Sequence, residues 1–244
     1  FGYVPDLDLD EDETLYPYLR EGERASLDYA IKKTHFDGLD LIPANLRLFQ
    51  SEYELAARMA RGQGTLLDRM AHGIASVQDL YDVIILDPPP ALGAISLSVL
   101  RAANALVVPV PPTVMDFSST TAFRAMLDET IQELASYDLA PQLAFLRFVA
   151  SKVDEGKSMQ KGLLDLMRQV YGNAMVRTPL KDSAEIDNAT ARLMTVYELE
   201  GPMTSKAVRD RCLTYLDGVN AEIELEIRKT WPSHLGRLRK AGHA

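Results

Sequence analysis

The 244-residue sequence has little cysteine and no long apolar run. Its single cysteine, Cys212, excludes an internal disulfide framework and suits a reducing compartment. No apolar stretch approaches the roughly 20 residues that a membrane-spanning helix needs. The N-terminal segment is acidic rather than basic and then apolar, so it does not resemble a secretory signal. We therefore expect a cytoplasmic protein with no membrane partner.

Metal-binding and nucleophile motifs are also scarce. No G-x-S-x-G elbow indicates a nucleophilic serine, although residue types alone leave a Ser-His-Asp triad open. The histidines have no metal-ligand spacing and no cysteine near them, so no zinc site is expected. They are His35, His72, His234 and His243.

Charge is negative overall and unevenly spread. The net charge of −9 argues against a surface built uniformly for nucleic acid, but it leaves room for a local basic patch. Residues 6–13 carry six acids and no base, whereas no acid follows Glu226. A solvated end is the favoured interpretation of both segments. The alternative for the basic tail, residues 231–244, is a weak nucleic-acid contact in which Trp231 stacks on a base.

Apolar segments alternate with helical patterns along most of the chain. Val83–Leu86 has no polar alternation, which predicts a strand buried on both faces. Such alternation is typical of an α/β fold, a mostly parallel sheet with helices on both faces and right-handed crossovers. The other predicted strands are Gly38–Pro43, Ala105–Val108, Leu143–Ala150 (interrupted by Arg147) and Ala174–Val176. The predicted helices are Thr14–Leu19, Ser26–Lys33, Glu52–Arg61, Thr65–Leu80, Ile95–Ala103, Phe117–Leu134, Met159–Tyr171, Ser183–Met194 and Lys206–Thr230.

One carboxylate stands at the end of the Val83–Leu86 segment. Asp87 follows four apolar residues, and the carboxyl ends of parallel strands line the ligand crevice of such a sheet. A surface turn acid is an equally good interpretation of Asp87 taken alone. Pro88, Pro89 and Pro90 come next, and prolines both end the strand ladder and stiffen a loop. A stiff loop after an acid suits a site that senses a phosphate.

These residues carry a family resemblance. Residues 81–93, Y-D-V-I-I-L-D-P-P-P-A-L-G, resemble the signature of the ParA/MinD-type partition ATPases, which are deviant P-loop proteins. Residues 100–112 resemble the next helix and strand of that family. The blocks 38–46 and 176–186 are closest to the RepA-type partition proteins of low-copy replicons. The resemblance runs over residues 1–230, which we take as one partial nucleotide-hydrolase domain, followed by the basic tail.

The resemblance implies an ATP-switched dimer that binds DNA non-specifically at the nucleoid and works with a ParB-like, centromere-binding partner. Asp87 would act in catalysis by holding Mg²⁺ through water, and Pro89 and Pro90 would form the switch behind it. Two loops would border the adenine of ATP, and basic residues in the C-terminal half would face DNA. The adenine residues would be Ser151, Lys152, Pro179 and Leu180, and the DNA residues Lys181, Arg192 and Arg209.

The family's phosphate loop, K-G-G-x-G-K-[ST], is absent from the sequence. We expect it, and the first strands of the sheet, to precede Phe1 in a longer protein. Gly156-Lys157-Ser158 contains G-K-S, but the first glycine of a true P-loop would fall on Ser151, and two acids would face the phosphates. A polar loop with Ser158 capping the next helix is the favoured interpretation. The chain by itself is expected to bind ATP weakly and to be inactive.

Two other functions stay open. The chain could be a truncated, non-catalytic adaptor that keeps only a dimer or partner surface. An in-frame K-G-G-x-G-K-[ST] in the DNA upstream of Phe1 would decide against the adaptor. A MinD-like positioning ATPase is the other alternative, but MinD-like proteins end in an amphipathic membrane helix. Here residues 231–233, W-P-S, break the last helix.

Overall fold

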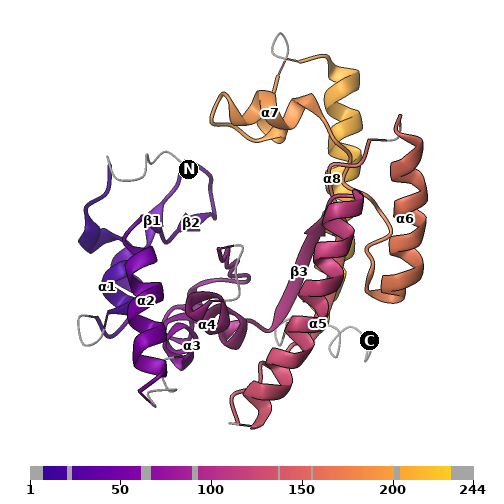
Figure 1. Cartoon of the computed structure of the whole chain (residues 1–244). Helices are drawn as coiled ribbons and strands as arrows, with labels where there is room; N and C mark the ends of the chain where they lie inside the picture. Colours follow the sequence, from indigo (N-terminus) through magenta and orange to yellow (C-terminus); the bar gives the residue numbers. More distant parts are fainter. Residues whose placement is uncertain are drawn as a thin grey trace, which may run out of the picture. The chain divides into compact units, whose positions relative to one another are not determined.

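A computed structural model describes residues 8–20, 24–61, 67–89, 93–136, 138–154, 156–200 and 204–231. The chain forms two compact units (Figure 1). Residues 1–104 and 133–142 make the N-terminal unit, and residues 105–132 and 143–244 make the C-terminal unit. The helices are α1 (Tyr16–Leu19), α2 (Leu48–Met59), α3 (Asp68–Ala75), α4 (Ala94–Ala102), α5 (Val114–Ser136), α6 (Ser158–Tyr171), α7 (Ala184–Thr190) and α8 (Lys206–Thr230). The strands are β1 (Lys32–Lys33), β2 (Asp40–Leu41), β3 (Ala105–Val110) and β4 (Phe145–Ala150).

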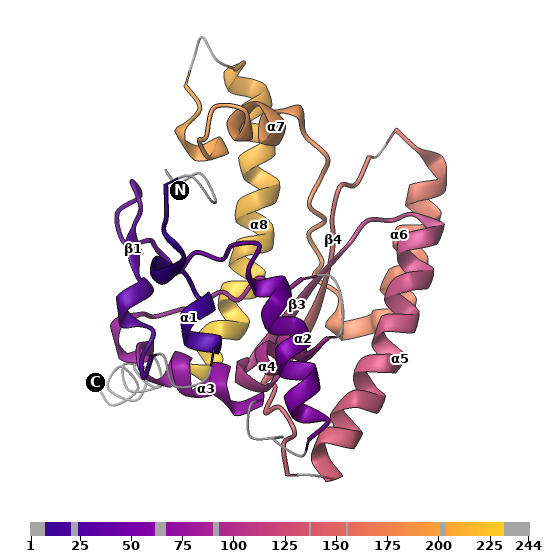
Figure 2. The same cartoon turned by 60° about the vertical axis from the view of Figure 1, so that its left-hand side comes forward.

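The C-terminal unit is built on the parallel pair β3 and β4. Their register sets Ala105 opposite Phe145 and Val110 opposite Ala150. Because neighbouring side chains of a strand point to opposite faces, Phe148 packs with α5 and α6 while Val149 packs with α8. Figure 2 shows β3 and β4 between α8 on one side and α5 and α6 on the other. The predicted α/β fold, with parallel strands and helices on both faces, is confirmed.

Helix α8 has the bounds that its apolar stripe predicts. In its C-terminal half, Val219 and Ile223 pack against Val149 of β4. In its N-terminal half, Cys212 packs in a cluster with residues of α7. The stripe therefore docks on the unit as predicted. Arg147, the charged residue within β4, pairs with Glu226 of α8 at 2.9 Å. An ion pair at the edge of the docked face thus accounts for the interruption in the apolar strand.

The chain after α6 runs beside the carboxyl end of β4. Phe148 and Met175 form a parallel bridge, and the predicted strand Ala174–Val176 is reduced to that bridge. The amide of Leu180 donates to the carbonyl of Ala150 at 2.8 Å, and the amide of Val153 donates back to the carbonyl of Leu180 at 3.1 Å. These bonds place residues 178–181 next to the loop that follows β4.

A single carboxylate holds this segment to α8. Glu222 accepts hydrogen bonds from the amides of Arg177 and Thr178, both at 2.9 Å, and from the Thr178 hydroxyl at 2.7 Å. Burial raises the pKa of Glu222, but the bonds from Thr178 and from the Arg177 backbone outweigh it, so the carboxyl pKa lies below its usual value. A Cβ on Gly218 would lie 2.8 Å from Cγ2 of Thr178, so the approach requires glycine there.

The core of the N-terminal unit gathers around α1 and α3. Tyr18, Leu27 and Met70 are buried in one cluster, and the Tyr18 hydroxyl donates to the carbonyl of Arg69 at 2.9 Å. Gly73 of α3 has no free space around it, because a Cβ there would meet Cε1 of Tyr18 at 2.8 Å. The close packing of α3 against Tyr18 and Leu27 therefore depends on the absence of a side chain at Gly73.

The predicted helix at Ser26–Lys33 is wrong. Residues 28–30 form a single 3-10 turn, and Lys32–Lys33 then pairs antiparallel with Asp40–Leu41. The hairpin is fastened by a 2.8 Å ion pair between Lys33 and Asp40. Pairing with residues further along the chain thus overrides the local helical pattern.

The prediction of a buried strand at Val83–Leu86 is also wrong. The segment forms neither helix nor strand in the described part of the chain. Only one of its faces is covered: Ile84 packs on the Tyr18 cluster, whereas Ile85 is 86% exposed and Val83 43% exposed. A fully apolar segment predicts two covered faces, and the described residues of its own unit cover one.

Other element boundaries differ from the predicted ones by several residues. The long helix predicted at Phe117–Leu134 begins at Val114, where Thr113 and Asp116 exchange hydrogen bonds at its start. The helix predicted at Thr65–Leu80 is α3, which ends at Ala75 and is followed by a 3-10 turn at residues 78–80. None of the described helices combines the length and apolarity needed to cross a bilayer.

Two glycine substitutions test the packing of the units. We expect Gly73→Ala to lower the free energy of unfolding by about 1–3 kcal/mol, because its methyl group overpacks against Tyr18. Gly162→Ala, on α6 with nothing within 4 Å of the new Cβ, should instead raise it by up to about 1 kcal/mol. Urea unfolding followed by circular dichroism measures both. Equal effects of the two substitutions would contradict this packing.

The Glu222 contact predicts a pH dependence of stability. A carboxyl whose pKa is lowered by folding stabilises the protein above its unfolded pKa, about 4.3, and loses that contribution as the pH falls through the folded pKa. Glu222→Gln should therefore destabilise the protein at pH 7 by about 1–2 kcal/mol and by less at pH 3. The control is Glu224→Gln, an exposed acid on the same helix. A Glu222→Gln effect that does not change with pH would refute the assignment.

Candidate functional site

Asp87 directly follows residues 83–86 and is exposed. The next described residues, Pro88 and Pro89, are also exposed, and Pro90 lies outside the described residues. The carbonyl of Pro89 accepts a hydrogen bond from the hydroxyl of Ser96 on α4 at 3.3 Å. The backbone beside Asp87 is thereby attached to the first turn of α4.

Helix α4 is in turn held by α2. The carboxylate of Glu52 accepts hydrogen bonds from the amides of Ala94 and Ile95, the latter at 3.0 Å. These amides lack partners within the helix, and the positive end of the helix dipole favours an anion beside them. Glu52 therefore acts as a cap contributed by another helix.

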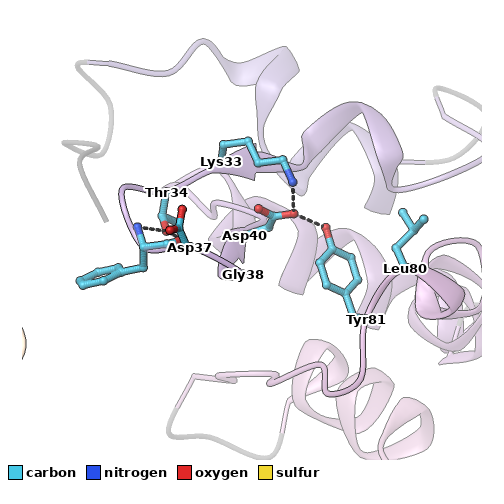
Figure 3. Close-up of a pocket in the computed structure, with 8 residues that line it drawn as sticks. Lys33, Thr34, Asp37, Gly38, Asp40, Leu80 and Tyr81 are labelled. Carbon is cyan, nitrogen blue, oxygen red and sulfur yellow. Dashed lines mark hydrogen bonds and ion pairs between the residues drawn. The ribbon is translucent and has the colours of Figure 1, made fainter. Parts of the chain in front are cut away.

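A hollow of about 470 Å³ lies beside the segment that leads to Asp87. Figure 3 shows Lys33 and Tyr81 converging on the carboxylate of Asp40. The Tyr81 hydroxyl donates to Asp40 at 2.7 Å, and burial together with this bond raises the pKa of Tyr81 to about 12. The hydrogen bonds from Lys33 and Tyr81 hold the pKa of Asp40 below its usual value. None of the predicted site residues lines this hollow. The hydrogen bond to Asp40 holds the Tyr81 side chain at its wall.

The predicted adenine residues come together at the carboxyl end of the β3–β4 pair. Ser151 is buried, and its amide donates to the carbonyl of Val110 at 3.1 Å. Lys152 has φ 52°, a left-handed conformation that turns the chain sharply after β4. Residues 179–180 lie next to this turn through the Leu180 bonds. The arrangement brings backbone groups, one hydroxyl and one exposed lysine to this edge.

The G-K-S segment does not resemble a phosphate loop in its geometry. The carboxylate of Asp154 accepts from the amide of Gly156 at 2.9 Å and pairs with Lys157 at 3.3 Å. These bonds, led by the one from Gly156, lower the pKa of Asp154. A carboxylate therefore already accepts from the Gly156 amide, which a phosphate would need. The predicted cap at Ser158 is wrong, because Ser158 is the first residue of α6 and Lys157 is the N-cap.

The three basic residues predicted to face DNA have different surroundings. The Lys181 ammonium lies 4.0 Å from the centre of the Tyr215 ring on α8. Arg192 is exposed after α7 and donates to the carbonyl of Asn188 at 3.0 Å. Arg209 donates to the carbonyl of Leu199, and its geometry favours a structural role. A shared DNA surface for the three stays a prediction.

Two residues of the site escape the sequence analysis. The sequence could have indicated Glu222, because an acid beside the docked apolar stripe of α8 needs hydrogen-bond donors in the protein. The sequence gives no indication of the role of Glu52, because acids are common on helices with a polar face. The part of the chain that the structure describes shows no group of three or more histidine, cysteine, aspartate or glutamate side chains that could hold a metal ion.

Comparisons with known proteins identify a family and relatives of this chain. The family described as "AAA domain" matches residues 6–143. A replication protein A of Rhizobium rhizogenes is 29% identical over 95% of this chain and 58% of its own length. Protein SopA of Escherichia coli K12 is 31% identical over 81% of this chain and 50% of its own length. The chain thus spans about half the length of the curated relatives it matches.

The chain is also similar to a solved structure of a partition protein. A structure titled "Partition Protein" superposes with a TM-score of 0.62 and 25% identity, covering 80% of this chain and 52% of its own. The family match covers more than half of the 244 residues, and the relatives are replication and partition proteins. The chain therefore belongs to the AAA domain family, as a member of its ParA-type partition ATPases.

Proposed function

We propose that this chain is part of a partition ATPase that binds ATP with Mg²⁺ and uses the nucleotide to switch a dimer. The dimer binds DNA non-specifically at the nucleoid in the cytoplasm. A ParB-like partner stimulates hydrolysis. The relatives named as replication and partition proteins support this assignment.

The observation that carries the proposal is the meeting of two loops at the carboxyl end of β3 and β4. Parallel α/β sheets bind ligands at this edge. The loop at Ser151–Lys152 and the segment at Pro179–Leu180 lie side by side there, joined by backbone hydrogen bonds. Their backbone groups can read the edge of an adenine ring, and the exposed Lys152 can meet a ribose or phosphate oxygen.

Asp87 fits a magnesium site of the water-mediated kind. Its carboxylate is exposed and stands alone, at the end of an apolar segment. Mg²⁺ keeps several of its waters and uses one or two protein carboxylates beside phosphate oxygens. When bound, the ion neutralises charge that develops on the phosphates. Asp87 would accept hydrogen bonds from its waters and so fix its position.

The uncovered face of residues 83–86 supports a larger sheet in the whole protein. Ile85 is 86% exposed although it lies in a wholly apolar segment. Isolated apolar surface of this kind favours pairing with another strand. We infer that further strands, and with them the phosphate-binding lysine loop, belong to sequence outside these 244 residues.

The adaptor function has one observation in its favour. The sequence contains no K-G-G-x-G-K-[ST]. In its G-K-S segment, the Gly156 amide already donates a hydrogen bond to the carboxylate of Asp154. An adaptor of this kind would keep the partner or dimer surface and lose hydrolysis. The activity of the full-length protein distinguishes the two functions.

Substitution of Asp87 tests the proposal in the full-length protein. Asp87→Ala should lower Mg²⁺-dependent ATP hydrolysis by at least about 100-fold, because the water ligands of the ion lose their acceptor. The fold should be unchanged, since Asp87 is exposed. Asp79→Ala, at an exposed acid of the preceding turn, serves as the control. Unchanged turnover in Asp87→Ala would rule out the role assigned to Asp87.

A further inference from the structure

The first turn of α4 is docked on α2 by one apolar and one charged contact. Leu55 of α2 is 3% exposed and packs on Ala94 and Ile95. One turn earlier on the same helix, Glu52 reaches the amides of those two residues. The two contacts fix both the distance of α4 from α2 and the direction of its axis.

Both oxygens of Glu52 are engaged, one on each amide. Oε1 accepts from Ala94, and Oε2 accepts from Ile95 at 3.0 Å. The residue before them is Gly93, where a Cβ would lie 2.0 Å from Oε1. No other residue fits at position 93 while the carboxylate stays in place. The cap is therefore a matched pair of Glu52 and Gly93.

The cap is connected to Asp87 through Ser96. Ser96 is 7% exposed, and its hydroxyl donates to the carbonyl of Pro89 at 3.3 Å. Pro88 and Pro89 have φ fixed by their rings, so little freedom separates that carbonyl from Asp87. A displacement of α4 is thus passed to Asp87 over two stiff residues.

We propose that Glu52 is a positioning residue for Asp87: it holds α4, and through Ser96 it holds the backbone that presents the Asp87 carboxylate. This role rests on the proposed function, because it matters only if Asp87 acts on the waters of Mg²⁺. Glu52 itself touches neither the ion nor the nucleotide.

The first test needs no nucleotide. In ¹⁵N NMR spectra of the full-length protein, Glu52→Ala and Glu52→Gln should shift the amide resonances of Asp87, Ala94 and Ile95. Hydrogen exchange at Ala94 and Ile95 should quicken about tenfold, because each amide loses a charged acceptor. Glu54→Ala, at an exposed acid two residues further along α2, should leave all three unchanged. An Asp87 resonance that does not respond to Glu52 would overturn the proposal.

The second test is the magnesium dependence of hydrolysis. Glu52→Ala should raise the Mg²⁺ concentration for half-maximal activity about tenfold, while the KM for ATP at saturating Mg²⁺ stays within about twofold. Glu52→Gln keeps one oxygen acceptor and should fall between native and Ala; it also serves if Glu52→Ala does not fold. A Mg²⁺ dependence equal to that of Glu54→Ala would overturn the role.

The matched pair supplies a double-mutant test. Gly93→Ala should shift the Mg²⁺ dependence in the native background, because its methyl group displaces the Glu52 carboxylate. Added to Glu52→Ala, it should cause no further shift. Additive shifts would show that Gly93 and Glu52 act separately, against the proposal. A native protein with no Mg²⁺-dependent hydrolysis would instead overturn the proposed function, and this role with it.

Discussion

The parallel pairing of β3 and β4 is the constraint on which the C-terminal unit depends. A parallel register sends both strands in one direction, so their carboxyl ends meet at one edge of the sheet. The connection between them has to cross back over a face, and α5 provides that crossover. The Ser151–Lys152 loop follows β4 at this edge, and backbone hydrogen bonds to Ala150 and Val153 hold Leu180 beside it. Strand direction and these backbone bonds together bring the two segments of the predicted site side by side.

Two glutamates hold backbone amides near the residues that carry the predicted chemistry, one in each unit. Glu222 holds the amides of Arg177 and Thr178, and Glu52 holds the first amides of α4. Each contact has a glycine beside it, Gly218 or Gly93, at which a Cβ would collide with the bonded partners. Charge-assisted bonds to backbone amides are stronger than neutral ones and leave the backbone little freedom. The same device therefore positions both regions that carry the predicted chemistry.

The part of the fold that the sequence predicts well is the part whose partners are local or amphipathic. Helix α8 has its predicted bounds because its stripe meets both β4 and α7. The parallel strands follow from apolar runs bounded by prolines and polar loops. The hairpin at Lys32–Leu41 was missed, since pairing across a loop leaves no periodic signal. Apolar composition predicts a buried strand at residues 83–86 because it reports burial in a complete sheet, whereas the described residues of the same unit cover only one face.

For the candidate site, the sequence identifies Asp87 and the adenine loops but not what holds them. Asp87 is singled out because a proline run follows it and because residues 81–93 resemble a family signature. Glu52 is invisible to such reasoning, as its function depends on a helix more than 40 residues away. Nor does the sequence reveal that Arg209, predicted to face DNA, donates to the carbonyl of Leu199; its DNA contact stays a prediction.

The central proposal is that one unit carries a magnesium-side acid and the other carries adenine-bordering loops, while the phosphate-binding loop is not among these 244 residues. Isothermal titration calorimetry of this chain with ATP and Mg²⁺ tests it most directly. The account predicts no binding in the micromolar range, because the amides and lysines that grip phosphate are absent. Micromolar binding by these 244 residues would contradict it.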